Sequence, residues 1–243
     1  MEIIRPEIFS DFGNVIAAVS TKKSDNQKNK YGFNLSLKVG DDENLVLENR
    51  NSFANQIGIN FNDVAHLDQI HSNYITIANK GGNCGNFDAI ITNKENVFVA
   101  VTIADCVPIL LFAPDKKICA AIHAGWRGSV SKITTETLKV MKLNFNVDVR
   151  KIKAFIGPSA SKCCYNVNAE TAEKFSSENV EFINQTYYVD LKKSNMNELL
   201  DFGVSKNNIL ISDYCTICNE NFQSFRRDKN NSGRMMALIG VKK

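Results

Sequence analysis

The stretch from Val97 to Pro114, VFVAVTIADCVPILLFAP, is the most informative part of the sequence for the fold. It is about as long as a membrane span. However, Asp105 stands in its middle, Pro108 follows, and no asymmetry of Lys and Arg flanks it. Two buried strands, Val97–Ile103 and Val107–Phe112, separated by a short turn that carries Asp105, explain the stretch better than a membrane helix.

Working outward, short apolar runs and segments of helical spacing alternate without strict order. Strands are expected at 34–39, 63–70, 74–78, 88–92, 118–123, 149–156, 209–211 and 235–241, and helices at 42–56, 130–143, 168–177 and 191–202. Residues 21–32 are expected to form a polar surface loop. Because strands cluster and helices are interspersed, the sequence predicts an α+β fold, a single domain over 1–243 with mixed β-sheets flanked by helices.

The composition excludes several classes of protein. The 243 residues have 44% hydrophobic and 23% charged side chains, an ordinary globular balance. A net charge of +3 without a long basic run predicts no nucleic-acid partner and no membrane partner. The N-terminus lacks the apolar core of a secretory signal. Seven irregularly spaced cysteines favour a reducing, cytoplasmic location over a disulfide framework.

Residues 123–128, HAGWRG, follow one of the expected strands and open a helix. A side chain at such a strand end, here His123, faces a cleft in many α/β folds. The two glycines allow the backbone to approach a ligand closely, and Arg127 offers a planar fork for phosphate or carboxylate. A tight turn with a structural histidine is the alternative interpretation.

Two further segments carry reactive side chains. Asp105 and Cys106 interrupt an apolar run, which is costly unless the carboxylate is paired or faces a cavity. Cys106 alone is equally well explained as a core residue, and His71, between two strand-like runs, is unremarkable alone. Together, His71, Cys106 and His123 match the three protein ligands of a catalytic zinc site, which leaves one position open.

Five segments carry a resemblance to a known family: QIHSN at 69–73, TIADCVPILLF at 102–112, AAIHAGWRGSV at 120–130, AFIGPSASKCCYNV at 154–167, and the tail with CT, FQSFRRD and SGR. From about Val15 to Val241 the chain resembles the laccase-domain family, also called YfiH-type or multicopper polyphenol oxidase. The resemblance implies one zinc ion on His71, Cys106 and His123. It also implies a purine nucleoside enzyme, a phosphorylase of adenosine, inosine and methylthioadenosine that also deaminates adenosine. Bacterial members are linked to peptidoglycan editing.

Phosphorolysis requires residues that hold phosphate against the ribose. Asn34 and Arg50 match the family pattern, and Arg227 and Arg234 are further candidates to bind substrate or phosphate. For each arginine, a surface position or a structural ion pair is the alternative. The loop around Lys22 departs from the family pattern, in which an Arg and a Gly pair stand here. Lys keeps the charge but lacks the bidentate fork.

The number of histidines and the motifs present limit the choice of metal and of the residue that transfers protons. Three histidines are too few for a blue copper site plus a three-copper cluster, and no methionine is placed as the axial ligand of a single copper. Copper is therefore not expected, and zinc is the metal that the resemblance implies. The H-x-E signature of zinc deaminases is absent, so Asp105 is the nearest acid or base.

Two alternatives to a zinc enzyme remain open, and a cysteine pair offers an alternative position for a metal site. In a metal-free hydrolase of peptidoglycan precursor editing, Cys106 would be the nucleophile and His123 its base. A scaffold protein without catalysis is a further alternative. The spacing Cys215-x-x-Cys218 is typical of a redox pair or of half a zinc knuckle. A second CxxC and a βαβ context are both missing, so Cys215 is assigned to the CT motif and Cys218 is interpreted as incidental. The adjacent Cys163 and Cys164 are interpreted as packing residues.

Overall fold

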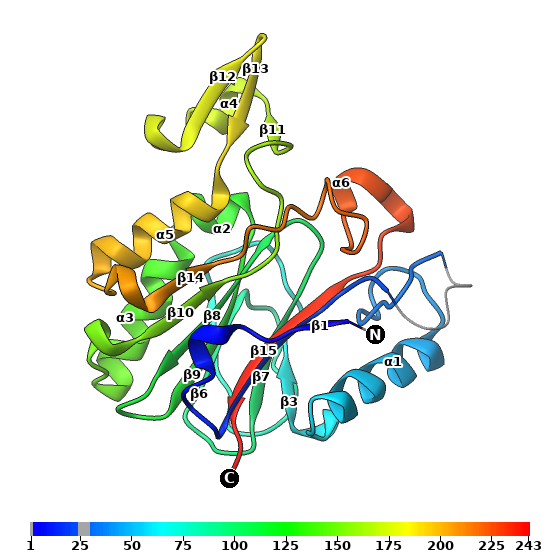
Figure 1. Ribbon diagram of the computed structural model, residues 1–243, viewed down its shortest axis with the longest axis vertical. Helices are drawn as coiled ribbons and strands as arrows, with labels where there is room; N and C mark the ends of the chain where they lie inside the picture. Colours follow the sequence, from blue (N-terminus) through cyan, green and yellow to red (C-terminus); the bar gives the residue numbers. More distant parts are fainter. Residues whose placement is uncertain (1, 24–29) are drawn as a thin grey trace.

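Two mixed β-sheets pack face to face in the computed structural model, which describes residues 2–23 and 30–243 (Figure 1). The first sheet has the order β1 (Ile3–Ile4), β2 (Val15–Ser20), β15 (Met235–Val241), β7 (Phe98–Ile103), β3 (Val64–His66), β5 (Gly82–Asn83). The second has the order β14 (Ile209–Ile211), β10 (Lys153–Ile156), β8 (Val107–Ala113), β9 (Ile118–Ala124), β6 (Ala89–Thr92), β4 (Ile75–Ile77). Each sheet contains parallel and antiparallel pairs, as the sequence predicts.

Helices cover the outer faces of both sheets. The α-helices are α1 (Glu43–Gln56), α2 (Trp126–Val130), α3 (Ile133–Phe145), α4 (Ala169–Ala172), α5 (Leu191–Phe202) and α6 (Phe225–Asp228). Helix α1 packs on the first sheet, and α3 and α5 pack on the second. A small sheet of β11 (Asn166–Val167), β13 (Thr186–Val189) and β12 (Val180–Ile183) projects at the top of Figure 1. The α+β prediction is confirmed.

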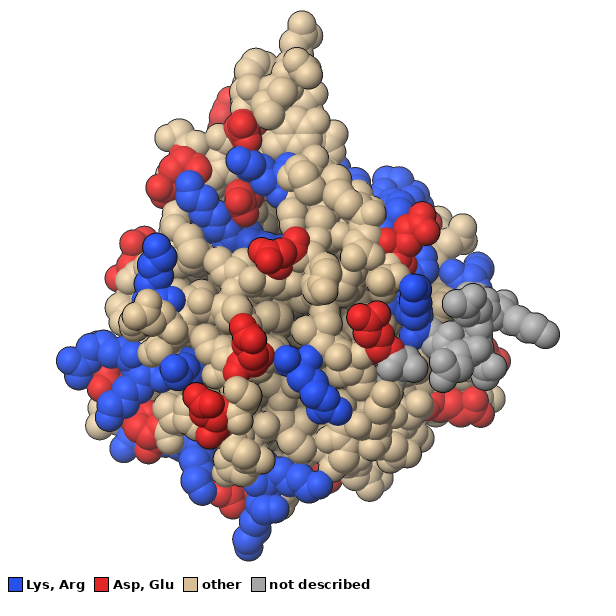
Figure 2. All heavy atoms as spheres, in the orientation of Figure 1, with Lys and Arg blue, Asp and Glu red and all other residues tan. Residues whose placement is uncertain are grey.

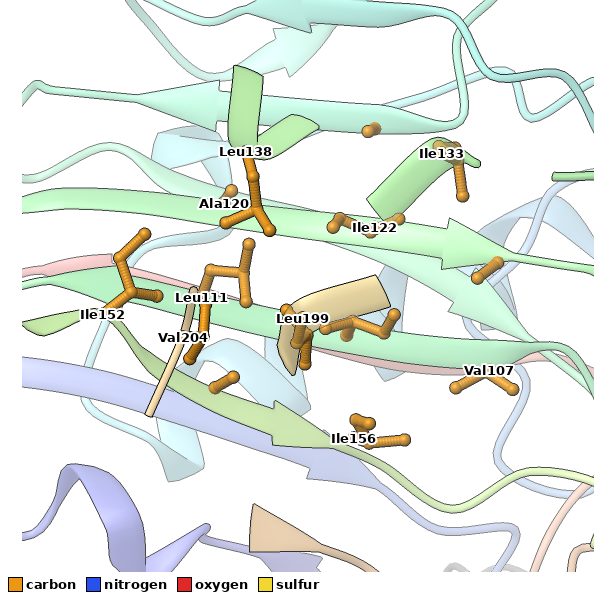
Figure 3. Close-up of a cluster of buried hydrophobic side chains, with 14 of the residues drawn as sticks. Val107, Leu111, Ala120, Ile122, Ile133, Leu138, Ile152, Ile156, Leu199 and Val204 are labelled. Carbon is orange, nitrogen blue, oxygen red and sulfur yellow. The ribbon is translucent and has the colours of Figure 1, made fainter. Parts of the chain in front are cut away.

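The central strands are apolar on both faces because both faces are buried. In β8, Ile109 and Leu111 point toward the helices of the second sheet, and the neighbours of Leu111 are drawn in Figure 3. Leu110 and Phe112, on the opposite face of the same strand, pack between the sheets. Full burial of one such side chain stabilises the fold by about 1.5–3 kcal/mol, so the two-sheet core explains the continuous apolar runs in the sequence.

The two predicted strands at 97–103 and 107–112 are confirmed, but they belong to different sheets. Strand β7 lies in the first sheet and β8 in the second, so the segment 104–106 is a crossing between sheets. Asp105 has a φ of 85°, in the left-handed region that Asp tolerates better than most residues. Within the described residues, no helix has the length and apolar character needed to cross a bilayer.

Several predicted elements are wrong or shorter than expected. Residues 34–39 form a turn and no strand, because the Asn34 side chain accepts a hydrogen bond from the Ser36 backbone N–H and competes with strand pairing. The helix expected at 130–143 is broken at Lys132, whose φ is 61°. The strand expected at 149–156 begins with a 3₁₀ helix.

Other differences concern weakly patterned segments. Only α4 forms within the helix expected at 168–177, and β3 is shorter than the strand expected at 63–70. The hairpin of β12 and β13 was not predicted, and its turn residues Asn184 and Gln185 both have positive φ, as a two-residue hairpin turn requires. Of the polar loop expected at 21–32, residues 24–29 lie outside the described residues.

Candidate metal and catalytic site

The reactive side chains lie together at the edge of the second sheet that is formed by the ends of its inner strands. The antiparallel register pairs Val107 with Ala124, which places Cys106 beside Gly125. The register of β6 and β9 places Asp88 beside His123, whose backbone N–H donates to the Asp88 carbonyl oxygen at 2.7 Å. Strand β4 runs parallel to β6, and the loop before it carries a histidine to the same edge. Strand pairing therefore brings residues distant in sequence together.

The three expected metal ligands meet at this edge. Sγ of Cys106 lies 3.9 Å from Nε2 of His71, and one ligand atom from each of the three residues lies within 4.8 Å of the others. The rings of His71 and His123 are 4.9 Å apart between centroids and nearly perpendicular. His71 is exposed, Cys106 is half-buried and His123 is buried. The site is consequently open toward solvent on the side of His71.

Gly125 makes the close approach possible. A Cβ atom at this position would lie 3.1 Å from Sγ of Cys106 and 3.1 Å from a ring carbon of His71. These contacts are tighter than ordinary van der Waals distances, so a side chain would push the two ligands apart. The glycine in HAGWRG thus serves the geometry of the site itself.

Asp88, which sequence reasoning did not single out, organises the site. Its buried carboxylate accepts backbone hydrogen bonds from Ile70, His71 and Ser72, and a further one from the Ser72 hydroxyl. Its Oδ1 also lies 2.8 Å from Nδ1 of His123. The loop at 70–72 and the His123 ring are thereby held by one anchor. The signal in the sequence was a carboxylate directly before a buried strand.

The charges of the site stabilise one another. Burial alone would raise the pKa of Asp88, but hydrogen bonds from His123 and Ser72 lower it to about 2. Burial alone would lower the pKa of His123, but Cys106 and Asp88 raise it to about 9. For the Cys106 thiol, burial is outweighed by His123 and His71, which lower its pKa to about 6. The geometry therefore favours an ionised sulfur beside an imidazole.

The donor set fits a divalent metal ion. Two imidazoles and one thiolate are the nitrogen and sulfur ligands that zinc binds, and three protein ligands leave an open position. A ligating histidine usually has a carboxylate on its other ring nitrogen, as Asp88 stands behind His123. The same three groups with Asp88 also resemble a nucleophile, base and orienting acid. The geometry accommodates both chemistries.

A cavity of about 660 Å³ opens next to these residues. Arg50 and Arg234 both line it. Arg50 is 7% exposed, its Nε donates to the Leu35 carbonyl, and burial lowers its pKa. Arg234 donates through Nη1 to the carbonyls of Ser232 and Gly233. Among the described residues neither arginine makes a salt bridge, so both charges remain available to an anion in the cavity.

Other cavity residues were missed by sequence reasoning. Arg226 lies over the ring of Tyr165, and its Nη1 donates to the Asn166 carbonyl at 2.9 Å. Gln69 exchanges hydrogen bonds with the backbone of Thr102 and ties the histidine loop to the end of β7. These residues lie in the quoted motifs, but nothing in the pattern indicated which of their side chains face the cavity.

Three of the predicted binding residues, Asn34, Arg127 and Arg227, do not line this cavity, and neither does Lys22. Asn34 is buried and holds the backbone N–H of Arg234. Arg127 is exposed and lies over the Trp126 ring. Arg227 uses its guanidinium on Asp228 and on the carbonyls of Thr216, Ile217, Asn219 and Phe222. Lys22, where the family pattern is broken, pairs with Asp228 at 2.8 Å.

Asp105 lines the cavity, but its carboxylate is engaged. Oδ1 accepts from the Thr216 hydroxyl at 2.7 Å, and Oδ2 accepts from the Arg226 backbone N–H at 2.6 Å. These bonds attach the sheet crossing to α6. The structure places Asp105 beside the candidate ligands, and a role as acid or base stays a prediction.

A buried carboxylate, two imidazoles and a thiol beside a basic cavity form a constellation typical of enzyme sites. The sequence matches the family model described as Multi-copper polyphenol oxidoreductase laccase over residues 16–242, and the chain belongs to this family. Purine nucleoside phosphorylase YlmD of Bacillus subtilis (strain 168) is 34% identical over 247 residues, covering 94% of this chain and 89% of that protein.

Two further comparisons agree. Adenosine deaminase RL5, from an unknown prokaryotic organism, is 30% identical over 259 residues, covering 98% of both chains. The crystal structure of the Bacillus licheniformis hypothetical protein YfiH matches with a TM-score of 0.92 and 27% identity, covering 99% of this chain and 96% of that one. The resemblance stated from the motifs is confirmed, and relatives named as enzymes support an enzymatic function for the chain.

Proposed function

We propose that this protein is a zinc-dependent purine nucleoside enzyme. Its reactions are phosphorolysis of adenosine, inosine and methylthioadenosine, and deamination of adenosine. The observation that carries the proposal is the convergence of His71, Cys106 and His123 beside a cavity that is lined by two arginines. Neither arginine forms an ion pair with the residues that the structure describes. The names of the relatives, a purine nucleoside phosphorylase and an adenosine deaminase, support the substrate class. The partners are then a nucleoside and phosphate, and the protein acts in the cytoplasm as a single domain.

Different residues of the protein would bind the metal, orient a ligand and bind phosphate. His71, Cys106 and His123 hold the zinc ion, which when bound supplies a Lewis acid and lowers the pKa of a water molecule toward about 7. Asp88 keeps the His123 ring in one orientation and one tautomer. In phosphorolysis, Arg50 and Arg234 bind the phosphate that attacks C1′ of the ribose.

Deamination places a different demand on the same cavity. Attack on C6 of adenine requires a group that transfers a proton to the departing ammonia. Asp88 is held by His123 and the loop at 70–72. Asp105, next to Cys106 in the sequence, already accepts hydrogen bonds through both oxygens, from the Thr216 hydroxyl and the Arg226 backbone N–H. We therefore expect deamination to be the slower activity.

The test is metal analysis by mass spectrometry on tag-free protein, wild type beside Cys106→Ala. Turnover of adenosine is measured on the same samples with and without phosphate. We expect the variant to lose one zinc ion per chain together with turnover. An unchanged metal content in a fully active variant would contradict the proposal. Copper in place of zinc in active wild type would overturn the choice of metal.

One arrangement favours a second candidate function. Asp88, His123 and Cys106 are ordered as acid, base and nucleophile, and the pKa of the thiol is lowered. A metal-free Cys–His hydrolase acting in peptidoglycan precursor editing would use this order directly. Metal removal by a chelator separates the candidates, because the hydrolase keeps its turnover and the zinc enzyme loses it.

A further inference from the structure

Four cysteines from two distant segments of the chain meet beside the cavity. Cys163 and Cys164 lie in the loop after β10, and Cys215 and Cys218 lie in the segment after β14. Their sulfur atoms all lie within 4.8 Å of one another. The CxxC pair was expected to lack a partner pair, and the adjacent cysteines were expected to be packing residues. The tertiary structure corrects both expectations by making each pair the partner of the other.

The sulfur distances correspond to one shared ion. Cys164 and Cys218 are 2.9 Å apart at Sγ, Cys163 and Cys218 are 3.5 Å apart, and Cys163 and Cys164 are 3.6 Å apart. Four thiolates around a tetrahedral zinc ion with bonds of about 2.3 Å have sulfurs separated by about 3.8 Å. Small adjustments of side-chain torsions reach this geometry. A multi-iron cluster needs more space between its cysteines than this group provides.

The backbone around Cys215 is already arranged for a thiolate. The N–H of Ser161 donates to Sγ of Cys215 at 3.4 Å. A backbone donor from the segment before Cys163 thus reaches the first sulfur of the CxxC pair. Donors of this kind stabilise negative charge on sulfur, which a cysteine that only fills space does not need.

A positive charge lies close to the chain segment that leads into Cys215. Lys192 is 7% exposed, and its ammonium donates to the carbonyls of Ser212 and Tyr214, just before Cys215. Among the described residues, its ammonium donates to these two neutral carbonyls and forms no salt bridge. Four thiolates around a divalent ion carry a net charge of −2, and a buried ammonium beside them offsets part of it.

We propose that Cys163, Cys164, Cys215 and Cys218 bind one zinc ion in a closed tetrathiolate site, separate from the site of His71, Cys106 and His123. All four positions are filled by protein, which is the arrangement of structural zinc. Each thiol loses its proton as its sulfur–zinc bond forms, and the four protons pass to solvent. No electron is transferred.

The position of this site suggests what it stabilises. Tyr165 follows the first cysteine pair and lies beneath Arg226 in the cavity. Thr216 follows Cys215 and donates to Asp105. An ion shared by the two loops would fix both residues relative to the sheet crossing. Zinc here is a positioning element for one wall of the cavity.

The test compares metal content per chain in wild type, Cys218→Ser, Cys163→Ser and the control Cys84→Ser. Cys163 and Cys218 are exposed, so serine is tolerated at both positions, and Cys84 lies outside both cysteine-containing sites. We expect each of the first two variants to lose one zinc ion per chain and the control to lose none. Cobalt-substituted wild type should show thiolate charge-transfer absorption, most of which Cys106→Ala retains and Cys218→Ser loses, because four of the five ligating thiolates belong to the proposed site.

Unchanged zinc in Cys218→Ser would overturn the proposal. Peptide mapping without reductant that finds a Cys164–Cys218 disulfide and no bound metal would also overturn it. Iron in place of zinc would overturn the choice of zinc as the bound metal. The outcome is independent of the proposed function, since loss of zinc in Cys106→Ala reports on the catalytic site alone. Double removal in Cys106→Ala/Cys218→Ser shows whether the two sites fill separately.

Discussion

The two groups of sulfur-containing ligands in this protein differ in almost every physical respect. The cluster of His71, Cys106 and His123 sits at the edge of a central sheet, with mixed nitrogen and sulfur donors and a carboxylate behind it. The four-cysteine cluster sits in loops near the surface, with sulfur donors only. The first leaves a side open to the cavity, whereas the second offers four protein donors, which would fill every position around a tetrahedral ion.

The difference shows how one fold can place a reactive centre and a structural centre in different surroundings. A reactive centre needs rigid strands, an open coordination position and charged partners that tune its ligands. A structural centre needs only to join neighbouring segments. Here the two cysteine loops reach the core of the second sheet through Ala160, Tyr165 and Ile217, and the proposed ion would join the same loops at the four cysteines. Basic and acidic residues are interspersed over the face of the molecule shown in Figure 2.

The largest effect is expected from Cys106→Ala against Cys218→Ser. Each variant should lose one metal ion per chain, but only Cys106→Ala should reduce nucleoside turnover to background, because only Cys106 lines the cavity beside the two histidines. Steady-state kinetics with adenosine and phosphate measure the difference. Equal loss of turnover in the two variants at 25 °C would erase the distinction between a reactive and a structural centre.

The second-largest effect is expected from Asp88→Asn, on the metal affinity of the site of His71, Cys106 and His123. Loss of the carboxylate behind His123 lowers the metal affinity of the catalytic site by about 10–100-fold, and competition with a chelating dye measures it. The four-cysteine site should keep its ion. If the affinity of the catalytic site is unchanged, Asp88 is an anchor of the loop only.

The same carboxylate predicts a pH dependence of stability. The pKa of Asp88 is about 2 in the folded chain against a reference of 3.8, so its contribution is complete above about pH 4 and disappears as the pH falls toward 2. The contribution is of order 2 kcal/mol. Urea unfolding of metal-free wild type and Asp88→Asn at pH 7 and pH 2.5 measures it. A stability difference that does not shrink at low pH would contradict this assignment.

Arg50→Gln tests whether an arginine that lines the cavity binds phosphate, in comparison with an arginine outside it. Loss of charge-assisted hydrogen bonds to phosphate, each of about 1.5–3 kcal/mol, should raise the KM for phosphate by at least about tenfold. Deamination, which uses no phosphate, should change less. Arg127→Gln is the matched control, because Arg127 is exposed and lies outside the cavity. Equal effects of the two substitutions would remove Arg50 from the phosphate site.

The smallest effect is expected from Cys163→Ser on stability. Loss of the structural ion should lower the Tm by about 2–4 °C for each kcal/mol lost, with little change in turnover well below the transition. Differential scanning calorimetry with and without added zinc measures the shift. A Tm unchanged by both the substitution and zinc would show that the cluster does not stabilise the loops.

Particular residues show how far sequence reasoning reached. The candidate ligands His71, Cys106 and His123 were identified through motifs, and the structure brings them together. Arg50 and Arg234 line the cavity as expected of phosphate-binding residues, while Arg227 is occupied by Asp228 and four carbonyls. Nothing local separates these arginines, because the free or engaged state of a guanidinium depends on neighbours far away in sequence.

The sequence by itself determined the apolar strands, their burial on both faces and the motif residues, because hydrophobic periodicity and short spacings are local properties. Only the tertiary structure decided that β7 and β8 belong to different sheets, that Asp88 stands behind His123, and that the two cysteine pairs share one site. These contacts join residues 35 or more positions apart. They follow from strand register and sheet packing, which are properties of the whole chain.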